Sequence, residues 1–216
     1  GGPRIKRELD KSNIQSKFIR GLRVTDEKII NIVESVLIDF NNDIVNSLKK
    51  FGTDAVSIHT KKNNIIKVTP EAKELGFVGI PNKIDNNLIE KILNKKQVPI
   101  ISPLGLGNDN HPYNINGDTA AGAIAKSLRS RRLLLMTNVE GVLDKDKKLI
   151  DEISSSEILK MIEDNIITEG MIPKINTCLD AVNNGVTAVG IIDGRKQHSI
   201  LFEIFSDKGS GTLIRK

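Results

Sequence analysis

The chain has 216 residues, enough for one sizeable core or two modest lobes, and its 38% hydrophobic and 27% charged residues are ordinary for a globular protein. Its net charge of +5 favours anionic partners, but the charges are spread along the chain, which argues against a nucleic-acid-binding stripe and leaves phosphate-bearing and dicarboxylate small molecules as equal candidates. The single cysteine excludes an intrachain disulfide and favours a reducing compartment, and no apolar run approaches the length that spans a membrane.

The N-terminal part of the chain alternates between helix and strand patterns. Thr25 is a plausible N-cap for a long helix, because apolar residues keep helical spacing from residue 29 to residue 48. Gly52, preceded by two lysines, indicates the end of this helix. Two short buried strands and a helix between them are expected next, at 55–58, 98–102 and 87–93.

A polar loop at 113–118 runs into a helix of very small residues. Asn114, Asn116 and Asp118 alternate along this loop, so in an extended loop the two amides share one face and the acid follows them to the helix start. Small residues allow close backbone approach, and a helix N-terminus offers unpaired N–H groups to an anion. The loop is therefore either a ligand-binding loop or an Asx-rich turn in which Asp118 is the N-cap.

The C-terminal part of the chain continues the alternation of strand and helix. A helix is expected to begin at Ser154, with Glu157 completing a capping box. Strands that alternate with helices indicate an α/β fold with a mostly parallel sheet covered by helices on both faces. Two further strands, a further helix and a lobe boundary are expected at 132–137, at 186–192, after Pro173 and near 128–132.

Lys174 stands in the first turn of the helix that Pro173 opens. Proline suits the first turn of a helix, but a lysine there is electrostatically unfavourable, because the helix macrodipole already makes that end positive. The arrangement indicates a strongly charged anion such as a phosphate. The alternative is an exposed lysine with no partner.

Two motifs are specific enough to indicate a family, Gly-Leu-Arg-Val-Thr at 21–25 and Gly-Met-Ile-Pro-Lys at 170–174. Further motifs stand at 1–3, 75–79, 113–118, 135–142 and 192–198. In this order and over essentially the whole chain, they resemble the amino-acid kinase family. The resemblance implies the carbamate kinase-like α/β fold, a mostly parallel sheet sandwiched by helices, with an amino-acid substrate lobe at 1–128 and a nucleotide-binding lobe at 129–216.

The motifs are most similar to those of the family branch that phosphorylates N-acetyl-L-glutamate in arginine biosynthesis. The resemblance implies that ATP phosphorylates the side-chain carboxylate of this substrate, giving the acyl phosphate N-acetyl-L-glutamyl 5-phosphate. It implies that Lys174 lies at the transferring phosphoryl group and that Asp118 orients the lysines through charge-assisted hydrogen bonds. ATP with Mg²⁺ is the implied cofactor, and the sequence shows no dedicated metal-binding cluster.

The resemblance also implies how the substrate is bound. Arg23 offers a planar fork to the α-carboxylate of the substrate, and Asn114 binds the same end. Backbone N–H groups of Gly1 and Gly2 would face the reacting carboxylate.

Asn138, Gly141 and Lys174 are the implied nucleotide-binding residues. Asn138 stands where the family usually has an aspartate, so an acceptor oxygen is kept and a charge is lost. The turn at 59–64 is less rich in glycine than the corresponding family turn, which leaves its conformation open.

The C-terminal segment resembles the arginine-sensitive branch of the family. In that branch His198, Glu203, Gly209 and Gly211 would form a feedback site for L-arginine, with Glu203 as the partner of the guanidinium group. The alternative is a helix that only packs its apolar face. The resemblance further implies a homo-oligomer, a nitrogen-regulatory signal protein as a partner, and a cytoplasmic location, or a plastid stroma location if this Lys-, Ile- and Asn-rich chain is organelle-encoded.

The start of the chain departs from the family pattern. Residues 1–3 read like the end of a glycine turn whose preceding strand is absent, and the Lys-x-Gly-Gly strand that supplies a second catalytic lysine is absent too. We therefore expect a truncated chain that is poorly soluble or loosely packed, and at least about a hundredfold slower than a version restored at its N-terminus. Two alternatives stay open: another family member acting on carbamate, aspartate, glutamate or a nucleoside monophosphate, and a non-catalytic homologue that binds ligands or partners.

Overall fold

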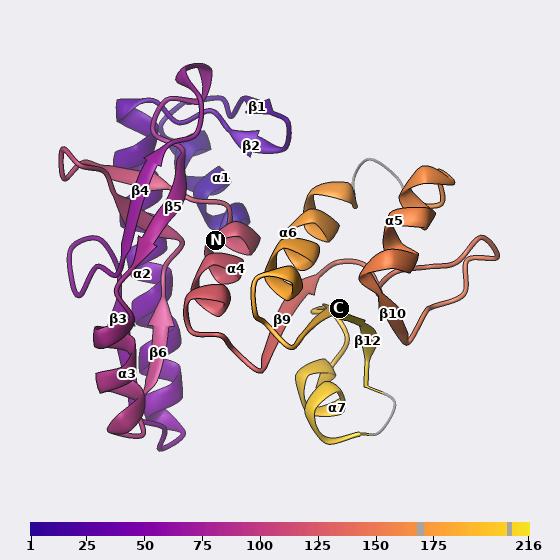
Figure 1. Ribbon diagram of the computed structural model, residues 1–216. Helices are drawn as coiled ribbons and strands as arrows, with labels where there is room; N and C mark the ends of the chain where they lie inside the picture. The colour runs from indigo at the N-terminus through magenta and orange to yellow at the C-terminus, as the bar shows by residue number, and fades with distance from the viewer. Residues whose placement is uncertain (168–170, 207–208) are drawn as a thin grey trace. The chain divides into compact units, whose positions relative to one another are not determined.

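The computed structural model describes residues 1–167, 171–206 and 209–216 (Figure 1). Gly170 of the Gly-Met-Ile-Pro-Lys motif therefore lies outside the described residues. The chain divides into two compact units, Gly1–Ala120 and Ala121–Lys216, called unit 1 and unit 2 below. This division falls inside a helix, α4 (Gly117–Ser127), whereas the sequence placed the lobe boundary after residue 128.

The helices of unit 1 begin where local signals and packing together place them. They are α1 (Gly2–Lys11), α2 (Glu27–Lys50), α3 (Asn86–Asn94) and the 3₁₀ turn η1 (Lys73–Leu75). The long helix and the helix before residue 98 were predicted and are confirmed. The predicted N-cap of α2 was wrong, since the side chain of Asp26, not of Thr25, accepts a hydrogen bond from Ile29 N at 2.9 Å.

Residues 2–11 form a helix directly after Gly1. Gly1 is the N-cap of α1, and Pro3 lies in its first turn, where a fixed φ angle suits a helix. Ile5 and Leu9 are buried one helical turn apart and pack in one cluster with Val33 and Leu37 of α2. Burial of this apolar stripe explains why these residues are helical.

The strands of unit 1 form three sheets. The strands are β1 (Phe18–Ile19), β2 (Leu22–Arg23), β3 (Ala55–Ile58), β4 (Ile66–Pro70), β5 (Gly79–Ile84), β6 (Val98–Ile101), β7 (Leu104–Leu106) and β8 (Pro112–Asn114). β1 and β2 pair as a hairpin, β3 pairs with β6 in parallel, and the third sheet has the order β5-β4-β7-β8. In that third sheet β4 and β7 are parallel, while the β4–β5 and β7–β8 pairs are antiparallel hairpins that the sequence did not predict.

Unit 2 is a four-stranded sheet covered by helices. Its strands are β9 (Arg132–Thr137), β10 (Glu152–Ser154), β11 (Ala188–Asp193) and β12 (Gly211–Arg215), in the order β10-β12-β11-β9. β9 is parallel to β11, and β12 is antiparallel to β11. All six residues of β11 are buried, so both faces of the sheet are covered there, because successive side chains point to opposite faces. This confirms the α/β fold with helices on both faces.

The helices of unit 2 after α4 are α5 (Ser155–Glu163), α6 (Ile172–Asn183) and α7 (Ser199–Phe205). The predicted capping box of α5 is present, with Ser154 and Glu157 bonding to each other's backbone N–H groups. Cys178 of α6 is fully buried in a core cluster with Val189, Ile191 and Ile214 of the sheet. It is therefore a core residue.

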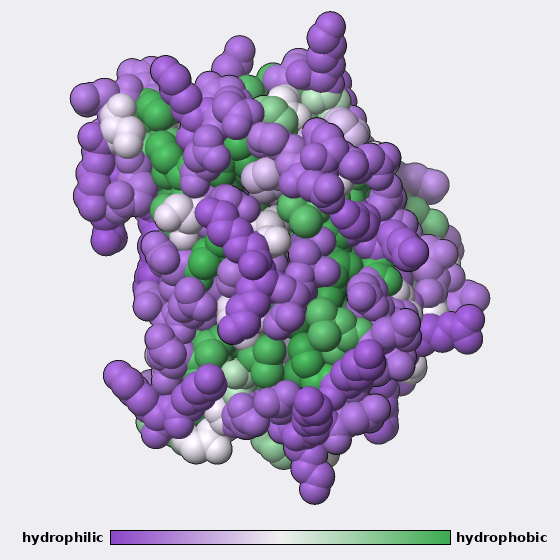
Figure 2. All heavy atoms as spheres, turned by 90° about the vertical axis from the view of Figure 1, so that its left-hand side faces the viewer, coloured by the Kyte–Doolittle hydropathy of each residue, from purple (hydrophilic) through white to green (hydrophobic). Residues whose placement is uncertain are grey.

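The surface of the molecule is mostly polar on the face that Figure 2 shows, with hydrophobic side chains visible in patches between the polar ones. Exposed large apolar residues of unit 1 include Phe18, Phe51, Leu93 and Val98. Among the residues that the structure describes, none of the helices is both long enough and apolar enough to cross a membrane.

Candidate functional site

Three backbone segments of unit 1 lie side by side and carry two of the predicted substrate ligands. Thr25, two residues after Arg23, accepts a hydrogen bond from Phe77 N at 2.7 Å and donates to the Leu75 carbonyl at 2.9 Å. Phe77 in turn accepts a hydrogen bond from Asn114 N at 2.9 Å. The segment around Phe77 therefore joins the Arg23 segment to Asn114. Thr25 is extended in this ladder, which explains why it does not cap α2.

Gly76 makes the close approach of these segments possible. Its φ angle is 66°, in the left-handed region, and a Cβ atom here would collide with the carbonyl oxygen of Thr25. Only glycine combines this backbone conformation with so near a neighbour.

Arg23 is held by its own hairpin. Its Nη1 donates to Ser16 Oγ, and its guanidinium lies 4.7 Å from the centre of the Phe18 ring. Burial lowers the pKa of Arg23, but a guanidinium stays charged at neutral pH. The structure thus places the Arg23 side chain against its own loop. The segment that carries it is joined to Asn114 by the backbone hydrogen bonds of Phe77.

Apart from Arg23, the predicted substrate ligands line one pocket of about 330 Å³. Gly1, Gly2 and Asn114 all line it, together with Gly117 at the start of α4. The rest of its wall is largely apolar and comes from α1, α2 and β6, with the polar side chains of Asn41 and Ser102 added. The pocket is therefore an apolar cleft with a few polar groups, which suits a small organic ligand.

The loop before α4 is not extended as far as the sequence suggested. β8 ends at Asn114, and Asn116 Oδ1 accepts hydrogen bonds from Asp118 N at 3.0 Å and Thr119 N at 3.1 Å. Asn116 is therefore the capping residue, so the alternative in which Asp118 is the N-cap is wrong. This leaves the Asp118 carboxylate in the first turn of α4, where the helix dipole favours a negative charge.

In unit 2, two parallel strands end together at the predicted nucleotide loop. Asp193 at the end of β11 pairs with Thr137 at the end of β9, and Gly194 N donates to the Thr137 carbonyl at 2.8 Å. Asn138 follows directly. The carboxyl ends of neighbouring parallel strands are where open α/β sheets bind ligands.

Asp193 carries a fixed negative charge at this edge of the sheet. Side-chain and backbone hydrogen bonds from Arg195 lower the pKa of Asp193 to about 2. Because this pKa is lower than in the unfolded chain, the ionised Asp193 stabilises the folded state at every pH above the ordinary pKa of an aspartate. The contribution is lost as the pH falls through about 2.

Gly141 anchors the loop that follows Asn138. Its φ angle is 153°, and a Cβ atom would lie 2.7 Å from Leu149 Cδ1 and 3.0 Å from Thr212 N. Next to it, Val142 N donates to Thr212 Oγ1 at 2.7 Å. The loop is thus tied to β12, which explains a glycine at this position.

Lys174 lies in the first turn of α6, as predicted, two residues after the helix begins at Ile172. It is half-buried. Lys174 belongs to unit 2, whereas Asp118 belongs to unit 1.

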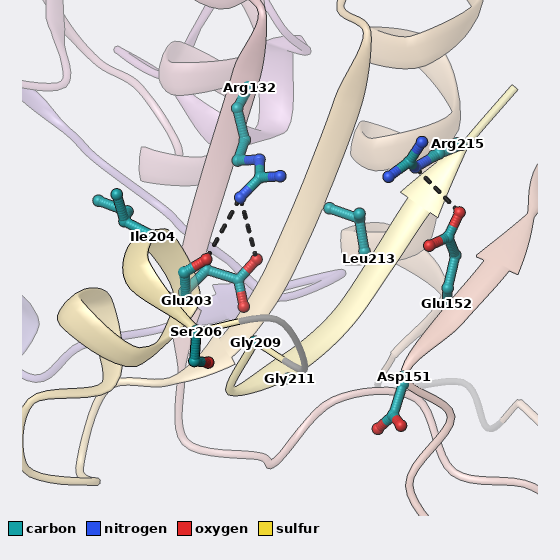
Figure 3. A pocket seen from close by; sticks show the side chains of 10 residues that line it. All are labelled: Arg132, Asp151, Glu152, Glu203, Ile204, Ser206, Gly209, Gly211, Leu213 and Arg215. Atoms are coloured by element: carbon teal, nitrogen blue, oxygen red, sulfur yellow. Dashed lines mark hydrogen bonds and ion pairs between the residues drawn. The ribbon is translucent and has the colours of Figure 1, made fainter.

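A second pocket, of about 320 Å³, gathers three of the four residues predicted for an effector site (Figure 3). Glu203, Gly209 and Gly211 line it, whereas His198 is the N-cap of α7 and is not among the lining residues. Glu203 is buried, accepts a hydrogen bond from Ser210 N at 2.9 Å and lies 3.7 Å from Arg132 Nη1.

The sequence did not predict the other charged residues of this pocket. Asp151 and Glu152 line it as well, and Glu152 Oε1 is 2.9 Å from Nε of Arg215 on the neighbouring strand. Figure 3 shows Arg132 and Arg215 each pointing toward its own carboxylate partner. Arg132, Glu152 and Arg215 come from β9, β10 and β12, and Asp151 directly precedes β10, so the sheet order brings them together. The described residues contain no group of three or more His, Cys, Asp or Glu side chains that could hold a metal ion.

Comparisons with known proteins show the family of this chain. The family model of the amino acid kinase family matches residues 1–193. The chain belongs to this family. It is 55% identical over 216 residues to an acetylglutamate kinase from Pelagibacter ubique, covering 100% of this chain and 75% of that protein. It is 48% identical to an acetylglutamate kinase from Clostridioides difficile, covering 100% of this chain and 77% of that protein.

Solved structures show the same fold. The protein smu.665 from Streptococcus mutans superposes with a TM-score of 0.84 at 30% identity, covering 100% of this chain and 83% of that one. A carbamate kinase from Giardia superposes with a TM-score of 0.65 at 17% identity, covering 87% of this chain and 74% of that one. The predicted family and the carbamate kinase-like fold are therefore confirmed.

Proposed function

We propose that this protein is an ATP-dependent kinase that phosphorylates the side-chain carboxylate of N-acetyl-L-glutamate, a step of arginine biosynthesis. The observation that carries this proposal is the 55% identity, over the whole chain, to an acetylglutamate kinase. Membership of the amino acid kinase family supports ATP as the phosphoryl donor.

The reaction needs two reactants held in line and compensation of the negative charge on the transferring phosphoryl group. Lys174 supplies a cation for that group, and Asp118 supplies a carboxylate that orients cations around it. The pocket of Gly1, Gly2 and Asn114 holds the amino acid, with Arg23 on the adjoining segment for its α-carboxylate. The acyl phosphate forms when a substrate carboxylate oxygen bonds to the γ-phosphorus and the bond from that phosphorus to ADP breaks.

The nucleotide is assigned to the edge of the sheet where β9 and β11 end. Asn138 and Gly141 lie on the loop that leaves this edge. Mg²⁺, when bound with ATP, neutralises charge on the β- and γ-phosphates. Because the phosphates themselves supply oxygen ligands to Mg²⁺, the site does not need a metal-binding cluster of the protein.

Trapping of the acyl phosphate with hydroxylamine tests this function. The chain, MgATP and N-acetyl-L-glutamate should give a hydroxamate, whereas aspartate, glutamate, carbamate and nucleoside monophosphates should give no turnover. Equal turnover with one of these other substrates would assign the protein to a different branch of the family. ADP release without any acceptor would instead indicate an ATPase.

We further propose that the pocket around Glu203 binds L-arginine as an effector. Buried Glu203 offers a carboxylate, and Asp151 and Glu152 bring the acidic residues of the pocket to three against its two arginines, Arg132 and Arg215. A guanidinium forms paired hydrogen bonds with such carboxylates.

Calorimetry with L-arginine tests the effector site. Glu203→Gln should weaken binding at least about tenfold, since it removes the charge from a charge-assisted pair. Glu163→Gln, an exposed carboxamide change on α5, is the matched control and should leave arginine binding unchanged. Equal affinity in the parent protein and in Glu203→Gln would place the arginine site elsewhere or exclude it.

A further inference from the structure

One histidine that belongs to none of the assigned roles joins three segments of unit 1. His111 lies in the turn between β7 and β8, and its ring stacks on that of Phe77, with centroids 4.1 Å apart and an angle of 21° between the planes. Its Nε2 is 3.2 Å from Oε1 of Glu27, the first residue of α2. Its Nδ1 is 3.0 Å from the carbonyl oxygen of Pro112.

The two partners of this ring determine which protonation state fits. A carboxylate and a carbonyl oxygen only accept hydrogen bonds, and a neutral imidazole has a single N–H to donate. Both contacts of His111 can therefore be hydrogen bonds only when both ring nitrogens carry protons. The geometry around His111 is that of an imidazolium.

The ring that stacks on His111 is that of Phe77, whose backbone joins the Arg23 segment to Asn114. Phe77 N donates to the Thr25 carbonyl, and the Phe77 carbonyl accepts from Asn114 N. Through the stack and the Glu27 bond, His111 connects this ladder to the start of α2, the helix that follows the Arg23 segment. His111 therefore contacts the residue through which the Arg23 segment and Asn114 are joined.

We propose that His111 is a positioning residue whose imidazolium, bound to Glu27, fixes Phe77 and so sets the arrangement of Arg23 and Asn114 for the α-carboxylate of the substrate. The assignment of these two residues to the substrate rests on the proposed function. The link from His111 through Phe77 to Asn114 does not, and it can be measured without any ligand.

Charged groups on the neighbouring elements surround this ring. Glu27 of α2 and Asp109 of the same turn are negative, while Lys67 of β4 reaches the turn through Asn110. Tyr113 of β8 meets the ring edge-on, and because burial raises the pKa of Tyr113 it stays neutral near pH 7. The positive end of α2 opposes a charge on His111.

Together these groups favour the protonated form of His111 over the neutral form. Partial burial lowers the pKa of His111, but the Pro112 carbonyl and the carboxylates of Glu27 and Asp109 outweigh it and raise this pKa above its ordinary value. With a raised pKa, the stabilising bond to Glu27 is fully present below the ordinary histidine pKa and is lost as the pH rises through the raised value. Substrate affinity should therefore fall with rising pH.

Calorimetry of N-acetyl-L-glutamate binding from about pH 5.5 to about pH 8.5 measures this dependence, since both carboxylates of the ligand stay ionised over this range. We expect the affinity of the parent chain to fall about threefold, the effect of losing one partly exposed ion pair. His111→Phe keeps the aromatic stack and removes the charge, and Glu27→Gln removes the partner. Both should give a flat profile at the weaker affinity, whereas Glu90→Gln, an exposed change on α3, should keep the parent profile.

NMR titration of the same proteins tests the link itself. The His111 ring should titrate with a raised pKa that Glu27→Gln lowers, and the amide signals of Phe77 and Asn114 should follow that pKa. The proposal is overturned if these amides do not follow His111, or if the parent chain binds N-acetyl-L-glutamate with a flat profile. Amides that follow His111 in a chain that never binds N-acetyl-L-glutamate would support the link and remove the proposed substrate.

Discussion

Two cationic residues assigned to opposite ends of the substrate should produce different kinetic defects when they are removed. Lys174→Ala should lower kcat about a hundredfold, or about 3 kcal/mol, with little change in KM, because a cation at the transferring group acts mainly in the transition state. Arg23→Ala should mainly raise the KM for N-acetyl-L-glutamate, because its contact persists from the ground state to the transition state.

Steady-state kinetics with both substrates varied separates the two defects. Arg23→Lys is a useful companion variant, since it keeps the charge and loses the planar fork that stacks on Phe18. Lys160→Ala, an exposed change on α5, is the control for loss of a lysine and should behave like the parent protein. A KM defect in Lys174→Ala together with a kcat defect in Arg23→Ala would reverse the assigned roles.

At the scale of the elements, glycines show where the backbone tolerates no side chain. Gly141→Ala places a methyl group 2.7 Å from Leu149 Cδ1 and forces an alanine into a φ angle of 153°. We expect unit 2 to lose about 2–4 kcal/mol of unfolding free energy, the sum of strain and overpacking. Denaturant unfolding measures the loss. Gly2→Ala, where a Cβ atom meets nothing within 4 Å, is the control and should cost less than about 1 kcal/mol.

Local signals were enough to predict the elements that depend on local chemistry. The apolar spacing of α2 and the capping box of α5 lie within one segment, so the sequence predicted both. The antiparallel hairpin β4–β5 was missed, because its partners are identified by pairing rather than by composition. The cap of α2 was misplaced by one residue, because a distant segment recruits Thr25 into a strand ladder.

The sequence could predict which residues belong to the candidate sites, but not how their side chains are arranged. The sequence named Asn114 and Glu203, and each lines a pocket. It could not show that Arg23 is held by its own hairpin, or that His198 lies outside the second pocket, since side-chain direction depends on the fold. His111 belongs to none of the family motifs, and only its contacts in the folded chain point to a role.

At the scale of the whole molecule, each unit has a hydrophobic core of its own. In unit 1, Leu9 and Val33 are fully buried in one cluster, and in unit 2 the same holds for Ile175 and Ile191. The two clusters share no residue. We therefore expect each unit to resist local opening through its own core.

Core substitutions should consequently act on one unit at a time. Ile191→Ala removes three carbons from a fully buried strand position and should cost about 2–5 kcal/mol, counted as lost transfer energy plus a cavity. Hydrogen exchange read by mass spectrometry should then show faster exchange for residues 121–216 with unchanged protection for residues 1–120. Val33→Ala, the matched change in unit 1, should give the reverse pattern. If each variant instead lost protection equally in both units, the chain would open as one cooperative body, because a single shared transition transmits any local destabilisation to every amide.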